Sequence, residues 1–280
     1  MKIAVPFLVL TCALTTSAFA DTFTFNNGTP DGRMGMASRP ASTGKTEIEA
    51  ADDFILTAPT SLISATFYGL LPSSAAILGV DVEIYRVFPF DSTFPASGNV
   101  PTRVNSPSDV AFDERASTAG LTFTSSVLNS SFTVANSVVN GINKVPGSFT
   151  GGEGAASGKE VQIDVNFTTP IDLGANHYFF IPQVLLSDGT FLWLSSPRPN
   201  PALSPDLQTW IRDGKLSPDW LRVGTDIVGG SPAPTFNGAF SLNGTTGAPT
   251  PEPSSFVLLL TGSVALLRRL RLRSPKALSF

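Results

Sequence analysis

Apolar and polar residues alternate with a period of two in many short stretches of this chain, which is the pattern of half-buried β-strands. Residues 161–167 are the clearest case, because Val161, Ile163, Val165 and Phe167 are separated by Gln, Asp and Asn. Further candidate strands with such alternation or a short apolar run are 22–25, 63–68, 80–85, 121–124, 132–135, 178–184, 191–194 and 239–242. No stretch shows a clear apolar stripe at helical spacing, and Ser, Thr and Asn in 127–139 favour strand or loop.

Turn signals separate these runs and indicate the fold class. They include Asn26-Asn27-Gly28, Gly151-Gly152, Pro170, Ser187-Asp188-Gly189, Pro197–Pro201 and Gly229-Gly230. Many short strands joined by such turns predict an all-β protein, an antiparallel β-sandwich of jelly-roll-like type over residues 21–244. Residues 89–118 and 195–235 are rich in loop signals, and we expect a binding face there.

The first twenty residues have the pattern of a secretory signal peptide. Lys2 supplies the basic start, residues 3–13 are mostly apolar, and Ala18-Phe19-Ala20 offers a cleavage site between small residues. We therefore expect an exported chain that begins at Asp21. Cys12 is the one cysteine and would leave with this peptide, so the mature chain would hold no disulfide.

The C-terminal part predicts a membrane segment. Residues 245–253 form a linker that contains the run Pro-Thr-Pro-Glu-Pro, and residues 254–267 are mostly apolar. Fourteen helical residues span only about 21 Å of a hydrocarbon core of about 30 Å. The leucines within the following arginine cluster lengthen the run, and arginines can reach the interface. We predict a transmembrane helix with its basic cluster over 254–273, cytoplasmic arginines, and a tail over 274–280.

These C-terminal residues resemble the PEP-CTERM sorting signal of exported bacterial proteins. The resemblance is carried by Pro251-Glu252-Pro253, the apolar segment and then Arg268-Arg269, about 25 residues in all. It implies recognition by an exosortase-type membrane protease, cleavage near Pro-Glu-Pro, and delivery to the cell surface or an extracellular polysaccharide matrix. Until cleavage, the helix would hold the protein in the cytoplasmic membrane. The tail 274–280 departs from the family pattern, which ends soon after the basic cluster, and the alternative is a permanent tail anchor.

Charge argues against two kinds of partner. The whole chain has 18 basic and 22 acidic residues, but its two ends hold six of the basic residues and one acid. Residues 21–249 therefore carry 12 basic and 21 acidic groups, a net charge of −9. A domain this acidic is a poor match for nucleic acid or for an anionic membrane surface.

Composition also argues against an enzyme. His177 is the one histidine. The sequence therefore argues against most Cys/His metal sites, and against Ser-His-Asp or Cys-His triads unless His177 serves alone. Because His177 stands at a strand start with no local nucleophile, it reads as a surface or capping group. A polysaccharide hydrolase would need two paired carboxylates, and the sequence does not show which of its many acids would form the pair. Hydrolysis remains a third class of function.

Two further groups are candidate sites. Trp210 and Trp220 flank Arg212 in a polar stretch, where aromatic rings could stack on a sugar, or could instead plug the end of the sandwich. Asp52 and Asp53 are weak candidates for a Ca²⁺ site, against solvated turn carboxylates. The sequence thus predicts an exported, non-enzymatic protein with a structural or adhesive role. The alternative is a carbohydrate-binding module. The ligand and the oligomeric state stay open.

Overall fold

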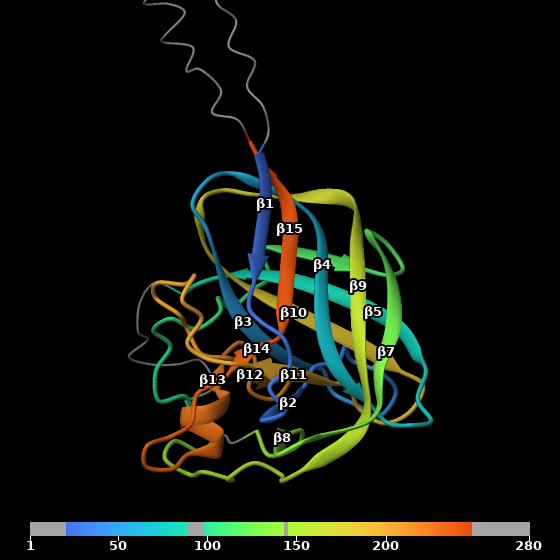
Figure 1. Cartoon of the computed structure of the whole chain (residues 1–280). Helices are drawn as coiled ribbons and strands as arrows, with labels where there is room; N and C mark the ends of the chain where they lie inside the picture. Colours follow the sequence, from blue (N-terminus) through green and yellow to red (C-terminus); the bar gives the residue numbers. More distant parts are fainter. Residues whose placement is uncertain (1–20, 89–97, 143–144, 248–280) are drawn as a thin grey trace, which may run out of the picture. The chain divides into compact units, whose positions relative to one another are not determined.

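A computed structural model describes residues 21–88, 98–142 and 145–247, which form an all-β fold (Figure 1). The predicted signal peptide and the segment from residue 248 onward lie outside the described residues. The elements are β1 (Asp21–Asn26), β2 (Met34–Ala37), β3 (Ile48–Leu56), β4 (Thr60–Leu71), β5 (Ile77–Arg86), β6 (Asp113–Ala116), β7 (Leu121–Val134), β8 (Asn136–Val138), β9 (Ala156–Leu173), β10 (Asn176–Leu186), β11 (Leu192–Ser196), β12 (Trp210–Asp213), β13 (Leu221–Arg222), the π-helix η1 (Val223–Val228), β14 (Asn237–Gly238) and β15 (Phe240–Thr246). Within the described ranges, no helix has the length and apolar character needed to cross a membrane.

The strands form two sheets that pack on each other (Figure 1). One sheet has six strands in the order β13-β12-β3-β10-β5-β6, and its pairings are antiparallel. The other has nine strands along the path β1-β15-β4-β11-β2-β8, with β9 on β4, β7 on β9 and β14 on β11. In this second sheet, β2 and β8 pair in parallel. Residues Thr22–Thr246 make up one compact unit.

Aromatic side chains from both sheets meet in the core. Phe180 of β10 stacks on Phe240 of β15 with ring centroids 4.8 Å apart, and Trp193 of β11 meets both rings. Phe67 of β4 lies 6.2 Å from Phe180. Burial of such rings dominates core energetics, and tilted or offset pairs add to it. The glycine at position 69 is required here, because a Cβ would lie 1.9 Å from the Phe191 ring.

The six-stranded sheet is buried on both faces. Along β3, Ala50 and Phe54 belong to the main core, whereas Ala51 belongs to a second apolar cluster on the opposite face. Along β10, Phe180 faces the main core and Phe179 the second cluster. This double burial explains the continuous apolar run at 178–182, which a one-sided strand would interrupt with polar residues.

Most predicted strands are confirmed, with one wrong turn. The period-two residues of 161–167 fall in β9, where the four apolar side chains are buried and their neighbours are more exposed. Pro170 was expected to end a strand, but it lies inside β9. The pairing of β9 with β4 shifts between Leu62 and Ser64. Because of this bulge, no ladder hydrogen bond is needed from Pro170, which has no N–H to donate. No α-helix occurs in the described part of the chain.

Candidate functional site

The outer face of the six-stranded sheet carries the second apolar cluster and Arg212. The cluster consists of Ala51, Tyr85, Phe179, Ile181, Leu207, Trp210 and Trp220. Trp220 meets Tyr85 edge to face, with centroids 5.5 Å apart, and its Nε1 donates to the Ser108 carbonyl at 3.3 Å. Trp220 is therefore a cover for the sheet and has no exposed ring face to offer a sugar.

Beneath Trp220 lies a closed network built around Arg212. Its Nη2 donates to Glu49 Oε1 at 2.9 Å and to the Tyr85 hydroxyl at 2.8 Å, and its Nε is paired with Glu49 Oε2. The Tyr85 hydroxyl in turn donates to Glu49 Oε1 at 2.9 Å. The guanidinium also lies 4.3 Å from the centre of the Trp220 ring. The third nitrogen, Nη1, donates to the carbonyls of Asp109 and Pro218. Every guanidinium nitrogen therefore has a partner inside the protein, so Arg212 stabilises the fold and does not face a ligand.

Glu83 of β5 adds a second carboxylate to this network. It is 7% exposed, and within the described ranges its Oε2 has no hydrogen-bond partner. Burial, followed by the nearby charge of Glu49, raises the pKa of Glu83 to about 8. Near neutral pH the Glu83 carboxyl therefore mostly keeps its proton and adds little negative charge to this network.

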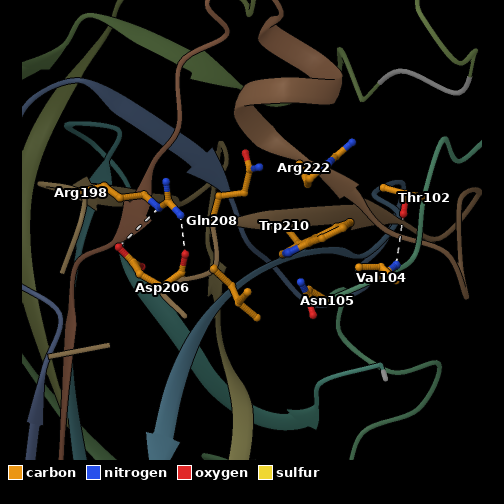
Figure 2. Close-up of a pocket in the computed structure, with 9 residues that line it drawn as sticks. Thr102, Val104, Asn105, Arg198, Asp206, Gln208, Trp210 and Arg222 are labelled. Atoms are coloured by element: carbon orange, nitrogen blue, oxygen red, sulfur yellow. Dashed lines mark hydrogen bonds and ion pairs between the residues drawn. The ribbon is translucent and has the colours of Figure 1, made fainter. Parts of the chain in front are cut away.

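A cavity of about 230 Å³ opens beside this network, at Trp210 (Figure 2). The residues lining it come from three places in the chain, which are the loop before β6, the loop before β12, and β12–β13. They are Thr102, Val104, Asn105, Arg198, Asp206, Leu207, Gln208, Trp210 and Arg222. Figure 2 shows Gln208, Arg222 and Asn105 placed around the Trp210 ring. Both loop regions expected to carry a binding face contribute to this cavity.

The charged side chains of the cavity are held in place by internal partners. Arg222 donates from Nε and Nη2 to the two carboxylate oxygens of Asp226, at 2.8 and 2.7 Å. Arg198 donates to the Asp206 carbonyl and, at 3.0 Å, to the Thr235 hydroxyl, and its Nε lies 3.6 Å from Asp206 Oδ2. Each guanidinium thus has a carboxylate beside it, and its position is fixed before any ligand arrives.

Asp206 connects the cavity wall to a buried polar network. Its Oδ2 accepts from the Asn200 backbone N–H at 2.7 Å, and its Oδ1 accepts from Asn237 at 3.1 Å. Asn200 donates to Asn27 at 2.7 Å, and Asn27 donates to Asp52. These amides anchor the loop before β12 on the end of the sandwich, which keeps Asp206 at a fixed position in the wall.

Asp52 and Asp53 do not form a shared site. As neighbours on β3 they point to opposite faces. Asp52 Oδ2 accepts from Asn27 and from the Gly238 N–H at 2.7 Å, and burial, then the Asp53 charge, raises its pKa. Asp53 Oδ2 lies 2.6 Å from His177 Nε2. Among the described residues, no group of three or more His, Cys, Asp or Glu is arranged to hold a metal ion.

The predicted site residues therefore separate into different environments. Trp210 reaches a cavity, Trp220 and Arg212 belong to the closed network, and His177 pairs with Asp53. The sorting residues Pro251, Glu252, Pro253, Arg268 and Arg269 lie outside the described residues. Asn105 and Arg198 were not selected from the sequence, because no local pattern connects residues nearly a hundred positions apart.

Comparison of the chain with protein-family models, with curated proteins and with solved structures gives no match.

Proposed function

We propose that this chain is an exported bacterial protein of the PEP-CTERM type, with a β-sandwich that has a structural or adhesive role at the cell surface. The observation that supports it best is the extent of the folded unit. The unit covers Thr22–Thr246, β1 begins at Asp21, and β15 ends at Thr246. Both expected processing points, after Ala20 and near Pro251–Pro253, therefore fall outside the folded unit.

The two ends of this unit suit removal of both terminal segments. β1 and β15 are neighbours in the nine-stranded sheet, and Figure 1 shows the start of β1 and the end of β15 at the same end of the sandwich. Cleavage at either point would break no strand pairing among the described residues. The proposal also includes jelly-roll-like connectivity and a transmembrane helix over 254–273.

The sorting mechanism follows from the residues of the motif. Pro251 and Pro253 disfavour helix and keep their segment extended, which is the form a protease needs. Arg268 and Arg269 would stay on the cytoplasmic side and stop translocation. Glu252 would be recognised by an exosortase-type protease and takes no part in the chemistry. The freed domain would then stay at the surface or in an extracellular polysaccharide matrix.

A second candidate function is carbohydrate binding, which the cavity at Trp210 favours. Its lining combines amides, a hydroxyl and guanidinium groups around the Trp210 side chain, which is itself 2% exposed, and such hydrogen-bonding groups suit a sugar. Polysaccharide hydrolysis stays a third class, and we assign the protein no catalytic residues.

The sorting proposal is tested by replacing Pro251-Glu252-Pro253 with Ala-Gln-Ala in the native host. We expect the variant to accumulate in the cytoplasmic membrane with its C-terminus intact, while the wild type reaches the surface. A matched control replaces Thr245-Thr246 with Ser-Ser, which keeps the motif. Equal surface delivery of both variants would refute recognition of the motif.

A further inference from the structure

The long strand β7 lies at an edge of the nine-stranded sheet (Figure 1). Among the described residues, β7 pairs with β9 and with no other strand, so no strand lies along its second edge. An open edge of this kind presents backbone N–H and C=O groups that can pair with another chain. At 14 residues, β7 offers an edge more than twice as long as a typical strand of about 5–6 residues.

Other edge strands of the two sheets are protected in ways that β7 is not. β6 has four residues, and three of them are charged, namely Asp113, Glu114 and Arg115. β13 and β8 have only two and three residues. In contrast, β7 has no charged residue and no proline between Leu121 and Val134. Charge, proline and short length are the common means of keeping sheet edges apart, and β7 has none of the three.

The sequence of β7 is close to a palindrome when residues are grouped by chemical type. Around a centre between Val127 and Leu128, each residue has one of similar chemistry at the mirror position. From the centre outward the pairs are Val127–Leu128, Ser126–Asn129, Ser125–Ser130, Thr124–Ser131, Phe123–Phe132, Thr122–Thr133 and Leu121–Val134.

The burial of the side chains in β7 has the same symmetry. The two end residues are buried, the two phenylalanines are half-buried, and the remaining residues are exposed. At the centre, Val127 and Leu128 are 57% and 51% exposed, although both are apolar. A strand with this pattern is complementary to itself under a twofold rotation, which is what a contact between two copies of one chain requires.

A β-bulge at the centre favours a second copy over an ordinary extended strand. The pairing with β9 shifts between Val127 and Asn129, where β7 contributes one residue more than β9. In a regular strand adjacent side chains point to opposite faces, so a twofold axis could not pass between two neighbours. The extra residue removes this restriction, and a second copy brings the same bulge to the same point. A second shift, between Asn129 and Phe132, limits the direct register to residues 125–130.

We infer that β7 pairs antiparallel with β7 of a second copy, so that the two nine-stranded sheets become continuous across a twofold axis between Val127 and Leu128. Cross-strand contacts between apolar and between hydroxyl side chains would add to the backbone hydrogen bonds. Residues 21–249 carry a net charge of −9, which repels two copies, and the uncharged strand is a place where they can approach. Salt should therefore strengthen the pairing. The inference goes beyond the proposed function and stands without it.

The register is tested by disulfide cross-linking of the full chain in detergent, in a Cys12→Ser background that removes the one native cysteine. Ser126→Cys and Asn129→Cys chains are purified separately, mixed and oxidised with diamide. In the inferred pair these two positions lie opposite each other, within the Cα separation of about 4.4–6.8 Å that a disulfide needs. The matched control mixes Thr122→Cys with Asn129→Cys. Those positions would be offset by four residues, or about 13 Å along the strand.

A charge at the axis provides a second, independent test. Val127→Lys brings two ammonium groups together at the centre of the pair, on a side chain exposed enough to leave the fold intact. Val110→Lys adds the same charge at a residue outside β7 that is 74% exposed. Sedimentation equilibrium in density-matched detergent measures the dimer dissociation constant of both variants and the wild type, and circular dichroism checks their fold.

We expect the matched cysteine mixture to form dimers at least about tenfold faster than the control mixture, with a higher yield at higher salt. Val127→Lys should raise the dissociation constant by at least about tenfold, and Val110→Lys by less than about twofold. Equal cross-linking of the two mixtures, equal effects of the two lysines, or a monomer at every concentration overturns the inference. Growth beyond dimers would contradict the twofold axis. A surface-delivered protein that stays monomeric would refute the pairing and leave the sorting proposal standing.

Discussion

Trp210 and Arg212 lie two residues apart on one face of β12, yet they belong to environments of opposite character. Arg212 is enclosed by Glu49, Tyr85 and Trp220 and uses its donors inside the protein. Trp210 borders a cavity, and its buried N–H has no hydrogen-bond partner among the described residues. The two residues share one face of one short strand, although one is an indole and the other a guanidinium. The difference comes from what the neighbouring strands and loops bring to each, so a polar residue near an aromatic one is no evidence for a site by itself.

The largest effect should come from opening the closed network. Arg212→Met leaves Glu49 buried without its cation beside Glu83, which we expect to cost about 3–5 kcal/mol of unfolding free energy. Arg222→Met is the matched change, since that side chain is 27% exposed, compared with 7% for Arg212. It should cost about 1 kcal/mol or less. Urea unfolding of the two variants measures the difference. Equal losses of unfolding free energy would mean that the buried Arg212 pair stabilises the protein no more than the partly exposed Arg222 pair.

The next effect is a pH dependence that arises from Glu83. Burial and Glu49 raise its folded-state pKa from 4.5 to about 8, so the folded protein holds this proton more tightly than the unfolded chain. Its contribution to stability is fully present below about pH 4.5 and is lost as the pH rises toward 8.

We therefore expect Glu83→Gln to become more stable relative to the wild type by about 4 kcal/mol between pH 4.5 and pH 8. Unfolding free energies of both proteins across this range measure the difference. A constant difference between them would contradict the protonated state of Glu83 near neutral pH.

A smaller effect compares two buried indoles. Trp193→Phe removes a hydrogen bond to the Ala239 carbonyl, which keeps its other bond from the Tyr68 N–H, at a cost of about 0.5–1.5 kcal/mol. Trp210→Phe removes an N–H that has no hydrogen-bond partner in the described part of the chain, so the change should cost less than Trp193→Phe by about 1 kcal/mol. Thermal unfolding of the two variants makes the comparison. A larger cost for Trp210→Phe would show that its N–H is already satisfied inside the protein.

The smallest effect tests the backbone at the cavity. Asn105→Gly should leave the unfolding free energy within about 0.5 kcal/mol of the wild type, because glycine adopts φ of +64° readily. Asn105→Val should cost about 1–2 kcal/mol, because a branched side chain is strained there. Chemical denaturation distinguishes them. Equal stability of the two variants would argue against the left-handed conformation.

Much of the sheet could be predicted from the sequence, because the period of two is a local signal. β9, β5 and β15 were found in this way, whereas the two- to four-residue strands β12, β13 and β14 are too short to show a pattern. Pro170 was misread because a bulge in a long strand accommodates it, and only the pairing with β4 reveals the bulge.

The site was less accessible to sequence reasoning, for two different reasons. Asp52 and Asp53 could have been rejected as a shared metal site, since adjacent strand residues face opposite ways. In contrast, nothing local links Asn105 to Arg198, or separates Trp210 from Trp220. The cavity arises from loops brought together by the sheet order, so its lining depends on long-range pairing.

The measurement that tests the account's central claim most directly is the intact mass of the native protein, taken together with its location in the cell. The account predicts a surface or extracellular species that starts at Asp21 and ends near Pro251-Glu252-Pro253. Such a species would contain the whole folded unit, Thr22–Thr246. A membrane-bound species that still ends at Phe280 would contradict processing by a sorting protease and would indicate a permanent tail anchor.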